Sequence, residues 1–65
     1  MDCLSVLNYG SKVLKSNDIK THRLDAELLL AKVLNKTREE LLINLNEYLD
    51  LNKLKKFKIH ILMLN

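Results

Sequence analysis

The 65-residue sequence contains no proline and no tryptophan, and it has only one glycine and one cysteine. The scarcity of turn residues beside sixteen leucines disfavours a turn-rich sheet and favours helices that pack through aliphatic side chains. A single cysteine forms no internal disulfide, and no His or Cys partner lies at metal-ligand spacing. We therefore expect one all-α domain over residues 1–65, a small helical bundle of about four helices.

The amino terminus lacks the features of a secretion signal. It has no basic leading region, no long apolar run and no small-residue cleavage site, and polar residues from Asn8 to Lys12 interrupt the apolar ones early. We therefore expect a cytoplasmic protein without a membrane contact.

Positive charge is concentrated in the last fifteen residues. Residues 1–50 hold seven Lys and Arg against all eight acids, whereas residues 51–65 hold four lysines and no acid. Such a run either contacts an acidic partner or a phosphate backbone, or it is an ordinary solvated helix face. Nucleic-acid binding has weak support because an aromatic platform and a recognition motif are missing. The candidate contact residues are Lys53, Lys55, Lys56 and Lys58.

The first half of the chain predicts two helices. Residues 3–16 place their apolar side chains within one arc after Asp2 as the N-cap, and Gly10 in that arc allows a neighbouring helix to approach closely. A second helix runs from the Thr21 cap to Leu34, before Asn35 ends it. This helix has two apolar faces and is expected to pack against more than one neighbour. One face comprises Ala26, Leu29, Leu30, Val33 and Leu34, the other Leu24, Leu28 and Ala31, and Glu27 lies between them.

The second half predicts two further helices. Thr37-Arg38-Glu39-Glu40 has the pattern of a capping box, so a helix begins at Arg38 and directs Leu41, Leu42 and Leu45 toward the core. Another begins after Asp50 and weakens after Phe57, where residues 58–61 alternate like a strand. Its apolar side comprises Leu51, Leu54, Phe57, Ile61 and Leu64.

No arrangement of side chains predicts a catalytic, cofactor or metal site. Asp25 and Glu27 point about 200° apart on a helix and cannot form a general acid/base pair, which leaves a structural role or a partner contact. The other candidates are interpreted as packing or surface residues, with Cys3 a small core residue and no nucleophile. They are His22 and His60, read as surface or packing histidines, and Tyr9, Tyr48 and Phe57, read as core or rim anchors.

The order of these segments resembles the amino-terminal domain of the HemK/PrmC family, the release-factor glutamine methyltransferases. The most specific part is Arg-Leu-Asp-Ala-Glu-Leu-Leu-Leu at 23–30, followed by Val-Leu-Asn-Lys-Thr at 33–37 and by Leu49-Asp50, and the match covers about residues 3–57. The resemblance implies a helical bundle that helps to hold a peptide chain release factor. In the family a following domain binds S-adenosylmethionine and methylates the glutamine of a Gly-Gly-Gln motif.

The sequence departs from the family pattern at its end. The family's paired arginines and Gly-Glu-Pro-like segment are replaced by Met63-Leu64-Asn65, and the cofactor loop and the Asn-Pro-Pro-Tyr motif are missing. We therefore expect no methyl transfer by this chain and no cofactor in it. The chain is expected to be a fragment or a truncated gene product. Its expected partners are a release factor and, if it is a fragment, its own methyltransferase domain. Exposed residues 59–64 would favour self-association. The alternative is a small basic nucleic-acid-binding or remnant structural protein.

Overall fold

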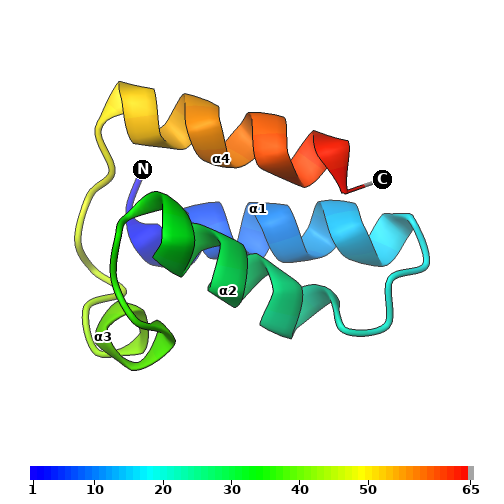
Figure 1. Cartoon of the computed structure of the whole chain (residues 1–65), viewed down its shortest axis with the longest axis horizontal. Coiled ribbons are helices and arrows are strands. Elements are labelled where there is room, and N and C mark those ends of the chain that lie inside the picture. Colours follow the sequence, from blue (N-terminus) through cyan, green and yellow to red (C-terminus); the bar gives the residue numbers. More distant parts are fainter. Residues whose placement is uncertain (65) are drawn as a thin grey trace.

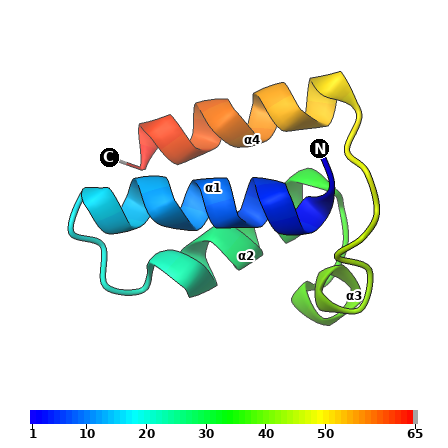
Figure 2. The ribbon, with the colours of Figure 1, turned by 180° about the vertical axis from the view of Figure 1, so that it is seen from behind.

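The computed structural model describes residues 1–64, which form an all-α bundle as predicted. Its four helices are α1 (Cys3–Ser16), α2 (His22–Val33), α3 (Arg38–Leu42) and α4 (Leu51–Met63). Figure 1 and the reverse view in Figure 2 show α1, α2 and α4 side by side, with the short α3 at the end of the bundle where α4 begins. A single β-bridge between Asp2 and Tyr48 ties the amino terminus to the segment before α4. The predicted strand-like segment after Phe57 is wrong, because α4 continues to Met63.

The helix starts follow from side chains that accept backbone N–H groups. The Asp2 carboxylate accepts the N–H of Ser5 at 2.8 Å, and the Asp50 carboxylate accepts the N–H of Lys53 at 2.9 Å. Such bonds satisfy donors that have no partner inside the helix. Thr21 occupies the predicted N-cap position of α2, but its side chain makes no capping bond. Its hydroxyl donates to the Asp25 carboxylate at 2.9 Å.

The predicted capping box at the start of α3 is confirmed. The Thr37 hydroxyl accepts the N–H of Glu40 at 3.1 Å, and the Glu40 carboxylate accepts the N–H of Thr37 at 3.0 Å. The bond from the backbone N–H of Thr37 to the carboxylate, with a smaller contribution from the Thr37 side chain, lowers the pKa of Glu40 from its ordinary value because it favours the charged form. The box therefore fixes the residue at which α3 begins.

Helices α1 and α2 each end in a turn with one residue in the left-handed conformation. Asp18 and Asn35 have φ angles of 64° and 57°, and short Asp and Asn side chains tolerate this conformation better than most. After each of them a backbone N–H reaches back to the last helical turn, from Ile19 to the Leu14 carbonyl at 3.1 Å and from Lys36 to the Ala31 carbonyl at 2.9 Å. The prediction that Asn35 ends the second helix is confirmed.

The core is aliphatic, with one aromatic ring against the only glycine. A Cβ atom on Gly10 would lie 2.5 Å from Cζ of Phe57 and 3.2 Å from Cδ1 of Ile61, so α4 approaches α1 at this point because residue 10 has no side chain. The predicted role of Gly10 is confirmed. The buried hydrophobic residues are Cys3, Val6, Leu7, Leu14, Ala26, Leu30, Ala31, Leu41, Phe57 and Ile61.

Several leucines that periodicity placed toward a neighbour are exposed. Leu24 and Leu28 of the predicted second face of α2 are 42% and 50% exposed, and Ala31 is the one member of that face that is buried. Leu51 and Leu64 at the two ends of α4 are exposed as well. These predictions were wrong because a helical wheel reports which residues share a side and not whether a second element covers that side.

Two smaller predictions also need correction. Tyr48 is 80% exposed and anchors neither core nor rim, since only its backbone pairs with Asp2. Of the three leucines directed toward the core, Leu41 is buried and Leu45 is half-buried and packs against the core, as predicted, whereas Leu42 is only half-buried.

Candidate functional site

The buried carboxylate of Glu27 joins three helices. Only 6% of this residue is exposed, and each carboxylate oxygen accepts one bond, from Nε of Arg23 at 3.1 Å and from Nε of Arg38 at 2.7 Å. Arg23 also donates from Nη1 to the Asn8 side chain of α1 at 2.8 Å. A buried charge is stable only when it is paired and hydrogen-bonded in this way. Glu27 therefore has a structural role, and little of it is open to solvent.

The spacing of residues along α2 predicted only one of the two ion pairs of Glu27. Arg23 precedes Glu27 by four residues and was expected to pair with it. Arg38 lies eleven residues after Glu27, beyond the turn, and helical periodicity gives no signal for such a pair. Its position as the first residue of α3, set by the capping box, was the available indication.

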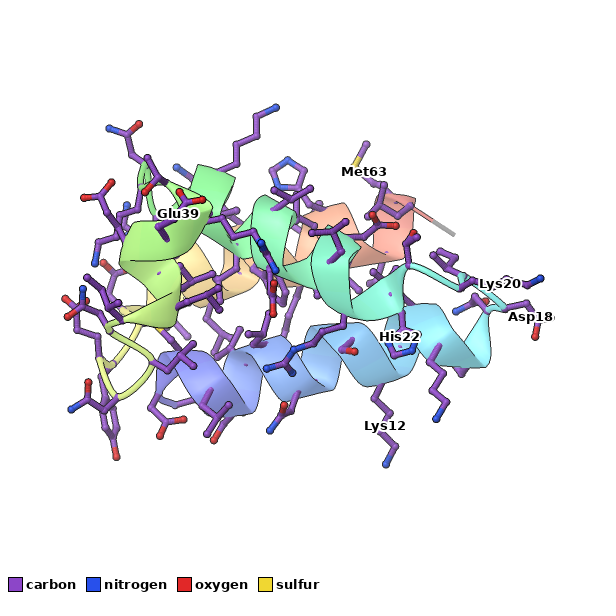
Figure 3. All side chains as sticks on the ribbon, turned by 90° about the horizontal axis from the view of Figure 1, so that it is seen from below. Lys12, Asp18, Lys20, His22, Glu39 and Met63 are labelled. Atoms are coloured by element: carbon purple, nitrogen blue, oxygen red, sulfur yellow. The ribbon has the colours of Figure 1, made fainter. Side chains whose placement is uncertain are left out.

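A second polar contact joins α1 to α2. The Ser11 hydroxyl lies 2.7 Å from Nδ1 of His22, and Ser11 is itself buried. Figure 3 shows His22 pointing from α2 toward α1. The sequence interpretation of His22 as a packing histidine agrees with this contact, although its partner was not predicted. His60 instead lies exposed on α4.

Cys3 is a core residue, as the sequence indicated. It is 2% exposed, and burial raises the pKa of its thiol from the ordinary value, so the reactive thiolate is disfavoured. Over residues 1–64, no three His, Cys, Asp or Glu side chains are grouped in a way that would hold a metal ion. In the same range, no helix has the length and apolar character needed to cross a bilayer.

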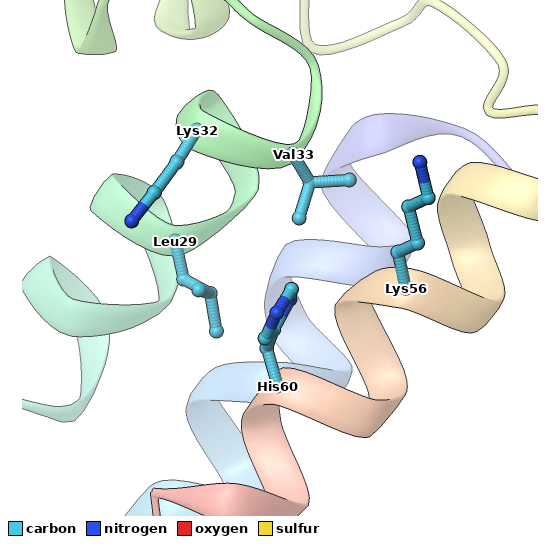
Figure 4. A pocket seen from close by; sticks show the side chains of 5 residues that line it. All are labelled: Leu29, Lys32, Val33, Lys56 and His60. Carbon is cyan, nitrogen blue, oxygen red and sulfur yellow. The ribbon is translucent and has the colours of Figure 1, made fainter.

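Two hollows of the surface lie between α2 and α4. One hollow of about 250 Å³ and a neighbouring one of about 350 Å³ have Leu29 and Lys32 in common, and the two together are here called the α2–α4 groove. In Figure 4, Leu29 and Val33 point from α2 toward α4, and His60 points back from α4. The groove is lined by Asp25, Leu28, Leu29, Lys32, Val33, Lys56, His60 and Leu64.

The groove combines an apolar lining with unneutralised positive charge. Within residues 1–64, neither Lys32 nor Lys56 forms an ion pair. Two acids elsewhere are already paired: Glu27 with two arginines, and Glu47 with Lys36, from which it accepts at 2.7 Å and whose pKa it thereby raises. Asp25 at one end of the groove already accepts the Thr21 hydroxyl.

The four lysines predicted as partner contacts are distributed around α4. Lys56 lines the groove, while Lys58 lies on the other side with its ammonium 5.4 Å from the centre of the Tyr9 ring of α1. At about 100° per residue, Lys53 and Lys58 are about 140° apart around the helix. Lys53 is half-buried and Lys55 is exposed. The lysines therefore do not form a single patch, and their contact with a partner stays a prediction.

The apolar end of α4 is divided between core and surface. Ile61 is fully buried, whereas Ile59, Leu62 and Met63 are 57%, 60% and 74% exposed. The structure thus agrees that most of residues 59–64 lie uncovered within the described chain. Self-association through them stays a prediction.

The fold and the site define a small all-α domain organised around the buried carboxylate of Glu27. A family model described as the PrmC N-terminal domain matches residues 5–61. Because the match spans most of the sequence, the chain belongs to this family, and the resemblance found in the sequence is confirmed. Searches of the curated proteins and of the solved structures gave no match.

Proposed function

We propose that this domain is a non-catalytic docking domain that helps a protein-glutamine methyltransferase to hold a peptide chain release factor in the cytoplasm. The observation that carries the proposal is the family match over residues 5–61. In this proposal S-adenosylmethionine and the transferring groups belong to the methyltransferase domain of the parent protein. The residues of this chain contribute contacts and orientation.

The geometry supports a rigid docking part. The Glu27 ion pairs and the contact between Ser11 and His22 fix α2 against α1 and α3. The outer side of α2 then presents exposed groups, among them Leu28 and Lys32, at a constant position. A surface that is already ordered loses less conformational entropy when a partner binds.

Nuclear magnetic resonance titration tests this function. The isotope-labelled chain is titrated with a class I release factor, alone and with the methyltransferase domain supplied in trans. We expect shifts confined to one contiguous surface and tighter retention of the release factor when the labelled chain is included. An unrelated acidic protein serves as the control for nonspecific attraction to the net charge of +3. No measurable contribution of the chain in either setting would reject the proposal.

A further inference from the structure

We infer that the α2–α4 groove binds an acidic segment of the partner protein, with apolar side chains of that segment in the two hollows and its carboxylates beside Lys32 and Lys56. The inference rests on the proposed function and deepens it, because it names the surface and the chemistry of the segment that is held. Three properties of the groove lead to it: its shape, its uncovered leucines and its charge.

The shape suits side chains. The two hollows, of about 250 and 350 Å³, are small, and they follow one another along the line where α2 and α4 meet. Leu29 and Val33 form the apolar floor and are half-buried already. Leu28 and Leu64 at one end remain 50% and 49% exposed. A peptide that presents apolar side chains at regular spacing would cover these leucines, which is how helices bind to grooves of this kind.

The charge selects the sign of the partner. Lys32 extends from one wall, and Lys56 and His60 come from the other (Figure 4). Helix α4 contains no acidic residue, and within residues 1–64 neither groove lysine has an ion-pair partner. Complementary carboxylates would gain Coulomb energy beside these two exposed ammonium groups, whereas a basic segment would be repelled. A second copy of this chain that docked through the same groove would bring the same lysines and is disfavoured for that reason.

A protein segment fits this groove better than a nucleic acid does. Bases of single-stranded nucleic acids stack best on Phe, Tyr or Trp rings, and the groove lining contains none of these, its one ring being the imidazole of His60. The ring of Tyr9 is engaged by Lys58, and Tyr48 lies outside the groove lining. Phosphates would also leave the leucines of the groove uncovered. Charge and apolar area together therefore favour an acidic amphipathic peptide.

Two matched pairs of variants test the inference against the class I release factor. Lys56→Glu reverses a charge in the groove, and its control, Lys12→Glu, makes the same change on the outer side of α1 (Figure 3). Leu28→Ser removes apolar contact area, and its control, Ile43→Ser, alters a residue that is 80% exposed outside the groove. All four positions are solvent-exposed, so the variants are expected to fold, which circular dichroism verifies.

We expect Lys56→Glu to raise the dissociation constant about tenfold and Leu28→Ser about threefold to tenfold, with both controls within about twofold of wild type. Equal weakening by Lys56→Glu and Lys12→Glu would overturn the inference, since only net charge would then act. Wild-type affinity in both groove variants would overturn it and leave the proposed function standing. Absence of binding by the wild-type chain would reject both. A single-stranded RNA oligonucleotide is added as a competitor. If it displaces the release factor and its affinity for the chain is unchanged by Leu28→Ser, the occupant is a nucleic acid and the inference fails.

Discussion

Helices α2 and α4 both pack on α1, but different forces hold them. Helix α2 is joined to its neighbours by directional polar contacts, from Glu27 to two arginines and from His22 to Ser11. Helix α4 is held by Phe57 and Ile61 against Gly10, and within residues 1–64 no side-chain hydrogen bond joins it to another helix. The position of a helix in this small domain is therefore fixed in two ways, by hydrogen-bond geometry for α2 and by close packing for α4.

The comparison bears on the groove, whose two walls come from these two helices. Polar contacts oppose small displacements of a helix, because a displacement lengthens a hydrogen bond or separates a buried charge from its partner. Packing of a large ring contributes more free energy in one place, so its loss is expected to be the more damaging. Substitutions in the packing of α4 should therefore lower the free energy of unfolding more than substitutions in the polar contacts of α2.

The largest effect is expected from Phe57→Ala. The ring is fully buried, and Phe→Ala substitutions in cores cost about 3–5 kcal/mol. Because domains of this length have marginal stability, we expect Phe57→Ala to abolish the cooperative unfolding transition. Thermal and urea unfolding followed by circular dichroism measure this. The control Phe57→Leu should retain a transition, and a native-like transition in Phe57→Ala would contradict the role assigned to the ring.

Glu27→Gln tests the polar side of the comparison. The substitution keeps the volume of the side chain but removes the charge that two arginines share, and it turns an amide donor toward a guanidinium donor. Since both arginines are partly exposed and can be hydrated, we expect the loss to be about 2 kcal/mol, below the range for fully buried pairs. Urea unfolding measures it. Asp25→Asn on the same helix serves as the control, and equal losses in both variants would show that Glu27 has no special role.

The parts of the fold that depend on neighbouring residues were predictable from the sequence. Asp2, Asp50 and the Thr37 box mark helix starts because a cap needs only the next few backbone N–H groups. Asn35 marks an end for a similar local reason. Gly10 was also interpretable, since a glycine on an apolar arc indicates a close neighbour whatever that neighbour is.

Contacts between segments were not predictable in the same way. The pair of Arg38 with Glu27 depends on how the turn after α2 directs α3, and no spacing rule encodes that direction. Glu27 was placed in a polar gap and proved to be buried, while Leu28 one position later proved to be exposed. Periodicity finds the two sides of α2, but only the arrangement of α1, α3 and α4 decides which side is covered.

Gly10→Ala measures how closely α1 and α4 approach. Alanine would gain up to about 1 kcal/mol of helix propensity, but its Cβ at 2.5 Å from Cζ of Phe57 forces the ring to move, and overpacking costs about 1–3 kcal/mol. We expect a net loss of about 1 kcal/mol. In a double-mutant cycle, Phe57→Leu should reduce this loss because leucine lacks the ring atoms that clash. Additive losses in the cycle would show that the ring does not limit the approach.

The smallest effect is expected at the capping box, which links α3 to the Glu27 cluster by placing Arg38 at the start of the helix. Because the pKa of Glu40 is lowered in the folded chain, its contribution to stability is present above the ordinary pKa and is lost as pH falls through the lowered value. Glu40→Gln does not titrate, so between about pH 5 and pH 3 it should lose less stability than the wild-type chain does. Urea midpoints across this range measure the difference, with Glu39→Gln as the neighbouring control. If Glu40→Gln and Glu39→Gln change the acid dependence equally, the bond to Thr37 does not hold α3, and Arg38 must be positioned by Glu27 alone.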